Sequence, residues 1–339
     1  MRLARRIASV LSLAAALAAP SVAAADTVYV ANYAASSVSV IDTTSNTELG
    51  RIAVGSEPIG MALSPDAARL YVANSGSSSV SVIDTASSTV VKTIPVSHFP
   101  NAVAVSPDGA RIYVAQGDFA GGGTVSVIDT ATDALTASIT VGRRPFSLAV
   151  ASGGARLYVA NEIDGTVSVV DTAANTVVAT VTASLSTGAV LASPDGARVY
   201  ALSRGNPNVV VIDTATNSVV ATLHLGAQAV GGALSPDGAR LYVMNLGADT
   251  VSVIDTASNG VVATVPVGSA PGSGAVTPGG GRVYSSNQSS DSVSVIDAST
   301  NTVIATVPVG RAPYAVIARA GSAPAPPSGG PPPLSLIHI

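Results

Sequence analysis

One short string recurs along this chain at a nearly constant interval. It reads V-S-V-I-D-T or a close variant, and successive copies lie 42 residues apart, with a single interval of 45. A fixed period of this length marks a repeat architecture, in which each unit buries its apolar face only against its neighbours. The aspartates of the successive copies are Asp42, Asp84, Asp129, Asp171, Asp213, Asp255 and Asp297. The chain is therefore predicted to contain seven copies of one structural unit.

Each unit reads as four β-strands joined by turns. In the second unit the strand-like runs are PIGMALS, RLYVAN, SVSVIDT and TVVKTIPV, which we name strands A, B, C and D. These runs are rich in β-branched residues, and Ser, Asn, Asp, Gly and Pro separate them. An S-P-D-G turn joins strand A to strand B in several units, because Pro presets φ and Gly accepts the left-handed conformation. After the first 25 residues no 12-residue stretch keeps a helical period.

Four strands in about 42 residues, repeated seven times, are typical of the blades of a β-propeller. Strand D should form the outer edge of each blade, since it carries Pro95, Pro266 and Pro308, and proline is tolerated at a sheet edge. The first strand, Thr27–Asn32, is of type B, and an unpartnered type A strand, Pro313–Ala318, comes last. We therefore predict an all-β, seven-bladed propeller with four antiparallel strands per blade. Its ring is closed by the C-terminal strand joining the N-terminal blade.

The repeats also resemble a known family. Y-V-A-N occurs at Tyr29, Tyr71 and Tyr158, together with S-P-D-G-A-R-L-Y-V and V-S-V-I-D-T. These motifs are similar to those of the YVTN family, which comprises seven-bladed propellers of secreted and cell-surface proteins, including surface-layer proteins. The resemblance covers residues 26–319, with departures at Tyr200 (YALS) and Tyr284 (YSSN). It implies the fold and an exported location, but little about function, because the family's motifs are structural.

The N-terminus has the pattern of a secretory signal. MRLARR is followed by 13 apolar or small residues, and Ala23 and Ala25 form an A-x-A cleavage site. A membrane span needs about 20 apolar residues, which is longer than this run, so the mature chain is expected to have no transmembrane span. The alternative is that the segment stays uncleaved as a membrane anchor. We predict a signal peptide at 1–25, the propeller at 26–320, and a Pro/Gly/Ser-rich linker or truncated tail at 321–339, after which an anchor could follow. The expected location is periplasmic, cell-surface or extracellular.

Composition excludes several classes of protein. Charged residues make up 11% of the chain and the formal net charge is −4; without the arginines of the signal peptide, 13 basic residues face 20 acidic ones. No nucleic-acid partner is expected of such a chain, and so much apolar residue excludes disorder. The sequence has no cysteine, so core burial alone must hold an exported chain together.

Residues that depart from the repeat concentrate in the D–A and B–C loops, which share one face in a propeller. Loops held by a rigid frame often bind partners, although these loops could also have drifted without function. Further departures are Asp118, Phe119, Glu162, Asp164, Leu185, Arg204, Asn206, Gln228, Asp249, Ser269 and Asp291. The predicted binding residues are Glu57, His98, Phe99, Arg143, Arg144, Phe146, Arg311 and Tyr314.

The sequence offers few candidate catalytic or metal-binding residues. Only His98 is well placed as a base or ligand, and no zinc-ligand set or G-x-S-x-G context occurs. No catalytic residue, metal or cofactor is therefore predicted; calcium is left open, because loop acids and carbonyls can bind it. The sequence favours a non-enzymatic exported propeller that binds an envelope or extracellular protein or glycan. Its arginines could hold carboxylates or sulfates, and its aromatic rings could stack on sugars. The alternatives are a lactonase-like or quinoprotein-dehydrogenase-like enzyme at the channel mouth and a purely structural lattice or spacer.

Overall fold

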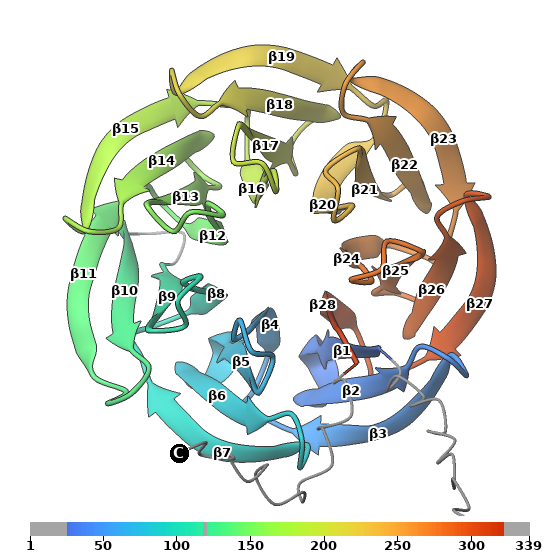
Figure 1. The fold of residues 1–339 in the computed structure, drawn as a ribbon, viewed down its shortest axis with the longest axis horizontal. Coiled ribbons are helices and arrows are strands. Elements are labelled where there is room, and N and C mark those ends of the chain that lie inside the picture. The colour runs from blue at the N-terminus through green and yellow to red at the C-terminus, as the bar shows by residue number, and fades with distance from the viewer. Residues whose placement is uncertain (1–25, 118–120, 322–339) are drawn as a thin grey trace, which may run out of the picture. The chain divides into compact units, whose positions relative to one another are not determined.

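Seven four-stranded antiparallel sheets stand in a ring (Figure 1). The computed structural model describes residues 26–117 and 121–321. The predicted signal peptide, residues 118–120 and the tail beyond 321 lie outside the described residues. Within them the only helices are two 3₁₀ turns, η1 (Tyr33–Ala35) and η2 (Ser75–Ser77). The predicted all-β, seven-bladed propeller is confirmed.

Every sheet has the strand order A–B–C–D, and the strand type fixes the radial position. Strands A lie innermost and strands D outermost (Figure 1). Strands A are β4 (Pro58–Leu63), β8 (Pro100–Val105), β12 (Pro145–Val150), β16 (Thr187–Ala192), β20 (Gln228–Leu234), β24 (Pro271–Val276) and β28 (Pro313–Arg319). Strands B are β1 (Thr27–Asn32), β5 (Arg69–Asn74), β9 (Arg111–Gln116), β13 (Arg156–Asn161), β17 (Arg198–Ser203), β21 (Arg240–Leu246) and β25 (Arg282–Asn287).

The two outer strand types complete the blades. Strands C are β2 (Ser37–Asp42), β6 (Ser79–Asp84), β10 (Gly123–Asp129), β14 (Thr166–Asp171), β18 (Asn208–Asp213), β22 (Thr250–Asp255) and β26 (Ser292–Asp297). Strands D are β3 (Thr47–Ala53), β7 (Thr89–Pro95), β11 (Leu135–Val141), β15 (Thr176–Thr182), β19 (Ser218–His224), β23 (Gly260–Pro266) and β27 (Thr302–Pro308). Blade 1 is the sheet β28–β1–β2–β3, and blades 2 to 7 follow in chain order. The predicted edge prolines lie at or near the ends of β7, β23 and β27, on the outer edge as expected.

The two ends of the described chain close the ring. β28 pairs with β1 in antiparallel register, with Thr27 opposite Arg319 and Val28 opposite Ala318. The closing strand ends at Arg319, one residue beyond the predicted end. Blade 1 is thus completed by strands that are nearly three hundred residues apart in the sequence, and the predicted closure is confirmed.

The hydrophobic core lies between neighbouring blades. Tyr29 and Val38 of blade 1 pack against Leu70, Val72 and Ile83 of blade 2, and the same arrangement recurs at each of the other interfaces. The tyrosine of each strand B is buried. Burial raises the pKa of six of these seven phenols. The repeated tyrosine is therefore a core residue and not a site residue.

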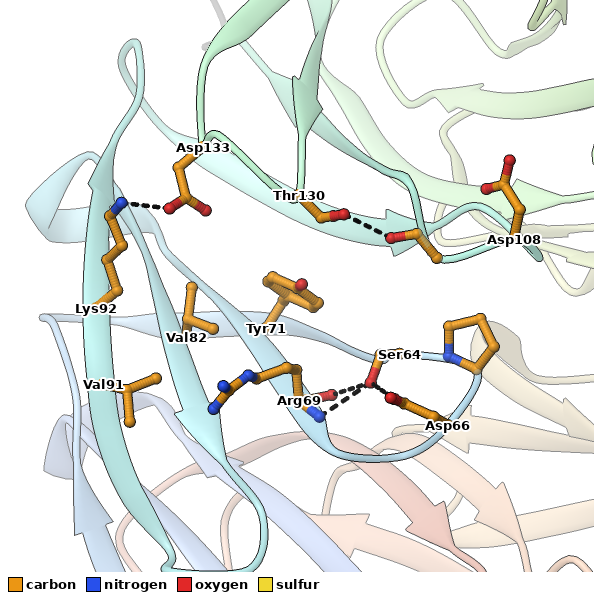
Figure 2. Close-up of a pocket in the computed structure, with 12 residues that line it drawn as sticks. Ser64, Asp66, Arg69, Tyr71, Val82, Val91, Lys92, Asp108, Thr130 and Asp133 are labelled. Carbon is orange, nitrogen blue, oxygen red and sulfur yellow. Dashed lines mark hydrogen bonds and ion pairs between the residues drawn. The ribbon is translucent and has the colours of Figure 1, made fainter.

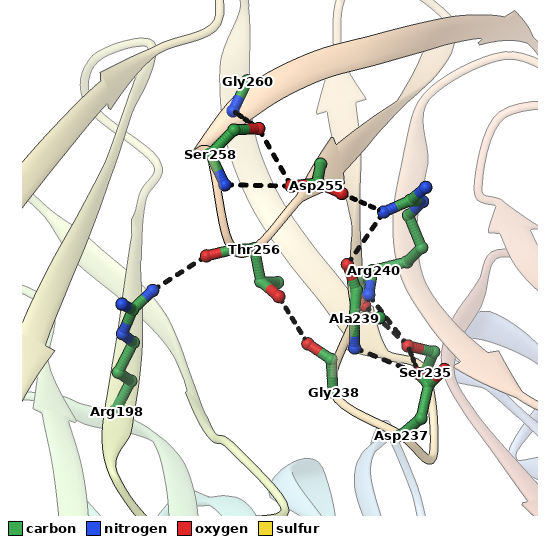
Figure 3. Close-up of polar contacts among 10 residues, drawn as sticks. All are labelled: Arg198, Ser235, Asp237, Gly238, Ala239, Arg240, Asp255, Thr256, Ser258 and Gly260. Atoms are coloured by element: carbon green, nitrogen blue, oxygen red, sulfur yellow. Dashed lines mark hydrogen bonds and ion pairs between the residues drawn. The ribbon is translucent and has the colours of Figure 1, made fainter.

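The A–B and C–D turns form one face of the ring, which we call the turn face, and their polar side chains bind one another. In blade 6, Asp255 accepts a hydrogen bond from the Ser258 amide at 2.9 Å, and the Thr256 hydroxyl donates to the Gly238 carbonyl at 2.6 Å (Figure 3). Arg198 of blade 5 donates to the Thr256 carbonyl at 2.8 Å and so joins two blades. The repeated aspartate therefore acts as a turn cap.

The arginines that begin strand B alternate between two partners. Those of blades 2, 4 and 6 pair with the strand C aspartate of their own blade, whereas those of blades 3, 5 and 7 donate to a carbonyl of the next blade. The first set is Arg69, Arg156 and Arg240, and the second is Arg111, Arg198 and Arg282. The strand B arginines therefore pair with an aspartate only in blades 2, 4 and 6.

Candidate functional site

The D–A and B–C loops interlock on the opposite face, which we call the loop face. Asn74 at the end of β5 donates to Ser79 and Ser81 of its own blade. Gly55, in the preceding D–A loop, packs so close that an added Cβ would lie 2.7–2.8 Å from Asn74. The Ser75 amide then donates to the Glu57 carbonyl at 2.9 Å. The predicted common face of these loops is confirmed, and each D–A loop rests on the B–C loop of the next blade.

The backbone of the D–A loop explains how three predicted residues are presented. In six of the blades the residue before strand A has a positive φ although it is not glycine, and Glu57, Phe99 and Arg144 are three of these residues, with φ of 54°, 49° and 50°. Such a conformation is uncommon for a side-chain-bearing residue. Because Ala270 and Ala312 adopt it too, it belongs to the repeat and is not itself a mark of function.

Phe146 lies at the channel mouth between two guanidinium groups. Phe146 is the second residue of β12 and is 8% exposed, and its ring centroid lies 5.1 Å from the guanidinium of Arg144 and 4.8 Å from that of Arg204. Glu162 forms an ion pair with Arg144 and lies 3.7 Å from Arg204. Burial, and then the positive charge of Arg204, lower the pKa of Arg144 despite Glu162. Since both guanidiniums lie against this ring, Phe146 offers little free surface for the sugar stacking that the sequence suggested.

Tyr314 joins this cluster from the other side of the mouth. Arg204 of blade 5 donates to the Tyr314 hydroxyl of blade 1 at 2.8 Å. Burial alone would lower the pKa of Arg204, but Tyr314 and Glu162 raise it on balance. The Tyr314 ring also lies 6.4 Å from Phe146 and 6.3 Å from Tyr33. We call Phe146, Arg204 and Tyr314, with their neighbours Arg144, Glu162 and Tyr33, the mouth cluster.

Glu57 lies at the edge of the mouth cluster. Burial, reinforced by a hydrogen bond to Glu57, raises the pKa of Tyr33. The structure thus brings together Glu57, Arg144, Phe146 and Tyr314 of the predicted site. It also adds Tyr33, Glu162 and Arg204, which the predicted site did not include. All three are the first residue after strand B of their blades, where the other blades have Ser, Gly, Leu or Gln.

The remaining predicted residues lie on the loop surface, outside the mouth cluster. His98 and Phe99 are exposed on the D–A loop of blade 3, and Phe99 is 47% exposed. Arg143 is exposed on the next D–A loop, where its Nε donates to Asp164 at 2.6 Å and its amide donates at 2.7 Å. Arg311 is exposed on the loop before β28. The predicted set therefore divides into a buried or half-buried group at the mouth and an exposed group on the loops.

An axial cavity of about 240 Å³ lies directly beneath the mouth cluster. Residues that follow the first position of all seven A strands line it, among them Ile59, Met61, Leu148 and Val230. Among the described lining residues, Arg204 is the only charged one. The cavity therefore has apolar and backbone walls and a single guanidinium.

The turn face has grooves between blades. The groove between blades 2 and 3 has a volume of about 520 Å³, and Lys92 of β7 reaches across it to form an ion pair with Asp133 (Figure 2). Lys92, the only lysine of the sequence, stands where other blades have Ala or Gly, and Asp133 stands where they have Asn or Ser. Similar grooves lie between blades 3 and 4 and between blades 6 and 7.

Within residues 26–117 and 121–321, no three His, Cys, Asp or Glu side chains are grouped so that they could hold a metal ion. In the same part of the chain, no helix is long and apolar enough to cross a membrane.

Comparison with known proteins places the chain in a family. The YNCE-like β-propeller family matches residues 3–323. The chain belongs to the YNCE-like β-propeller family. The membership agrees with the seven blades of the structure, whereas the finer resemblance to YVTN repeats stays a prediction. No curated protein sequence matches this YNCE-like propeller.

Solved structures include similar propellers. Hydrazine synthase from Kuenenia stuttgartiensis has a TM-score of 0.73 and 26% identity, over 80% of this YNCE-like chain and 92% of that chain. A functionally unknown protein from Desulfotomaculum acetoxidans has a TM-score of 0.74 and 15% identity, over 88% of this chain and all of the other. The second likeness shows the fold alone.

Proposed function

We propose that this chain is an exported, non-enzymatic binding protein that holds an envelope or extracellular protein or glycan on its loop face. Export is supported by the signal-like residues 1–25 and by the resemblance of the repeats to YVTN propellers of secreted and surface-layer proteins. The propeller supplies a rigid frame, and the loops supply the recognition surface.

The difference between the two faces carries this proposal. On the turn face the same internal hydrogen bonds recur from blade to blade: an aspartate caps each C–D turn, and a threonine ties that turn to the A–B turn in five blades. On the loop face, neighbouring blades instead expose chemically different side chains. The D–A loop that enters blade 3 exposes His98 and Phe99, and the loop that enters blade 4 exposes Arg143. The loop that enters blade 5 exposes Leu185, which is 76% exposed.

The chemistry of these side chains suits a surface with anionic and apolar groups. Arg143 is 56% exposed and its ion pair with Asp164 is open to solvent. Exposed ion pairs contribute little to stability, so Arg143 can exchange Asp164 for a carboxylate or sulfate of a partner at small cost. Phe99 and Leu185 supply exposed apolar surface on the two neighbouring D–A loops, and aromatic and arginine side chains are the usual anchors of interfaces.

The experiment is co-sedimentation of the purified protein with envelopes of the source organism. The test variant carries His98→Ala, Phe99→Ala and Arg143→Ala. Arg156→Ala is the matched control, because Arg156 is also an exposed arginine of blade 4 paired with an aspartate, but lies on the turn face. We expect the triple variant to lose at least tenfold in binding and the control to bind like the wild type. Equal binding of all three proteins, or no binding by the wild type, would contradict the proposal.

A further inference from the structure

Arg204 is a partly buried cation with an incomplete set of partners. Its side chain is 27% exposed, and its hydrogen bond at 2.8 Å goes to the Tyr314 hydroxyl, which is uncharged. The nearest carboxylate oxygen, on Glu162, is 3.7 Å from its Nε, beyond hydrogen-bonding distance, and Glu162 also pairs with Arg144. A guanidinium has five N–H donors, and a buried charge is costly unless it is paired and hydrogen-bonded.

From this geometry we propose that the mouth cluster and the axial cavity bind a small organic carboxylate through Arg204. The site is separate from the exposed loop residues of the proposed partner surface, and the inference goes beyond that function. A carboxylate would supply a charged hydrogen-bond acceptor, which Glu162 does not supply at 3.7 Å. Arginine and carboxylate are matched in shape, because the planar guanidinium can donate two parallel hydrogen bonds.

The surroundings of Arg204 fix its orientation toward the cavity. Its stem lies across Gly188 at the start of strand A of the same blade, where any added Cβ would overlap it. On one side the guanidinium packs on the Phe146 ring at 4.8 Å, and its end is held by Tyr314. The arginine is therefore held in place before a ligand arrives, which reduces the entropy lost on binding.

The cavity limits the rest of the ligand. Its walls combine backbone groups of glycines and small residues with aliphatic side chains such as Ile59, Met61 and Val230, and Arg204 is the only charged group among its described lining. A volume of about 240 Å³ is below the roughly 300–1,000 Å³ of pockets for drug-sized molecules. The ligand class is thus a small, compact carboxylate, with its body between the backbone and aliphatic walls of the cavity and its carboxylate on Arg204.

Calorimetric titration of the full-length protein with benzoate tests the proposal, and benzamide serves as the neutral probe of the same shape. We expect benzoate to bind at least tenfold more tightly than benzamide. Arg204→Gln should reduce benzoate binding at least tenfold and remove the preference for benzoate. Gly188→Ala should weaken binding in the same direction, because the new methyl group displaces the arginine stem without removing its charge. Arg156→Ala, on the opposite face, should bind benzoate like the wild type.

Two variants, Arg204→Gln and Gly188→Ala, distinguish a loss of binding from a folding defect. Each variant is first checked for wild-type circular dichroism and cooperative urea unfolding, and Gly188→Ala keeps every charged group of the mouth cluster. The proposal would be overturned if the wild type did not bind benzoate, or if it bound benzamide as tightly as benzoate. Binding that survives both Arg204→Gln and Gly188→Ala would also overturn it.

Discussion

The strand C aspartates act one residue at a time, yet they define the repeat. Asp297 accepts amide hydrogen bonds from Ser299 and Thr300, each at 2.9 Å, and its counterparts in the other blades cap their turns in the same way. These bonds form only with the ionised carboxylate at full strength. A hydrogen bond from the Ser299 hydroxyl, followed by the two amide bonds, lowers the pKa of Asp297 to about 2. In blade 6 the hydrogen bonds from Ser258 and then Arg240 lower the pKa of Asp255 to about 2.

Acid should therefore weaken the fold through these turns. A carboxyl group whose pKa is lower in the folded state stabilises the protein above its unfolded pKa, and that stability is lost as the pH falls toward the folded pKa. The window here runs from about pH 4, the ordinary value for Asp, down to about pH 2. We expect Asp297→Asn to be less stable than the wild type at pH 7 and the gap to close near pH 2. Urea unfolding at a series of pH values measures it, and a gap that stays constant with pH would contradict the assignment.

The capping residues and the mouth cluster differ in how far the sequence could predict them. Asp297 and its partners are two or three residues apart, so local turn chemistry was enough. Arg204 and Tyr314 are 110 residues apart and meet only because the ring brings blades 5 and 1 to a common mouth. Departure from the repeat identified Arg204 and Tyr314 separately, but spacing along the chain carries no information about contacts across the ring.

At the scale of the element, the outer strands contain a feature that alternation does not predict. Strand D has two adjacent β-branched residues in most blades, and a regular strand would turn one of them inward. Instead a β-bulge interrupts the C–D ladder: in blade 5, Val211 pairs with Ala221 and Ile212 with Val219, which leaves Val220 unpaired. Bulges occur at sheet edges and help to prevent edge-to-edge pairing. Strand positions were thus predictable, whereas the facing of these valines was not.

Because of the bulge, substitutions at two residues of β19 should change the free energy of unfolding by very different amounts. Val220 is 57% exposed and Leu223 is 7% exposed in the core between blades 5 and 6. We expect Val220→Ala to change the free energy of unfolding by less than about 0.5 kcal/mol. Leu223→Ala should lower it by about 2–4 kcal/mol, because it leaves a cavity in a packed core. Urea unfolding of both variants gives the comparison, and similar losses for the two would show that the bulge does not direct Val220 outward.

At the scale of the whole molecule, the blades are joined by a common core and by polar bridges that differ from one interface to the next. Lys92 pairs with Asp133 between blades 2 and 3, and Arg198 reaches the Thr256 carbonyl between blades 5 and 6. The interface between blades 7 and 1 has its own bridge, from Arg282 to the Thr43 carbonyl. The apolar repeat predicted the common core, but the bridges depend on side chains that reach across blades.

Blade 1 contains strands from both ends of the described chain, and their pairing closes the ring. Blade 1 joins the two ends of the described chain by backbone pairing, since Val28 lies opposite Ala318 and Tyr29 opposite Ile317. The ring cannot open at its ends without breaking this ladder. A ring with its ends between two blades would be held at that point by side-chain contacts alone.

Two circular permutants separate these contributions. In both, Ala318 is joined to Thr27 through Ser-Pro-Asp-Gly-Ala, the segment that links Leu234 to Arg240 in blade 6. The equivalent register, Ala318 opposite Val28 and Leu234 opposite Leu241, shows that this turn fits. The first permutant opens between Asp237 and Gly238, so that blade 6 is now shared by the two ends. The second opens between Gly226 and Ala227, in a D–A loop, so that no blade is shared.

We expect the first permutant to unfold at nearly the wild-type urea concentration and the second at a clearly lower one. The permutants have the same residues and the same new turn, so the difference isolates the backbone ladder at the point of closure. In the second, blades 5 and 6 can separate without breaking a strand ladder, and the terminal blades should exchange their amide hydrogens faster than the rest. Equal unfolding midpoints would mean that the apolar packing between blades closes the ring by itself, and that the strand shared by the two ends contributes little to stability.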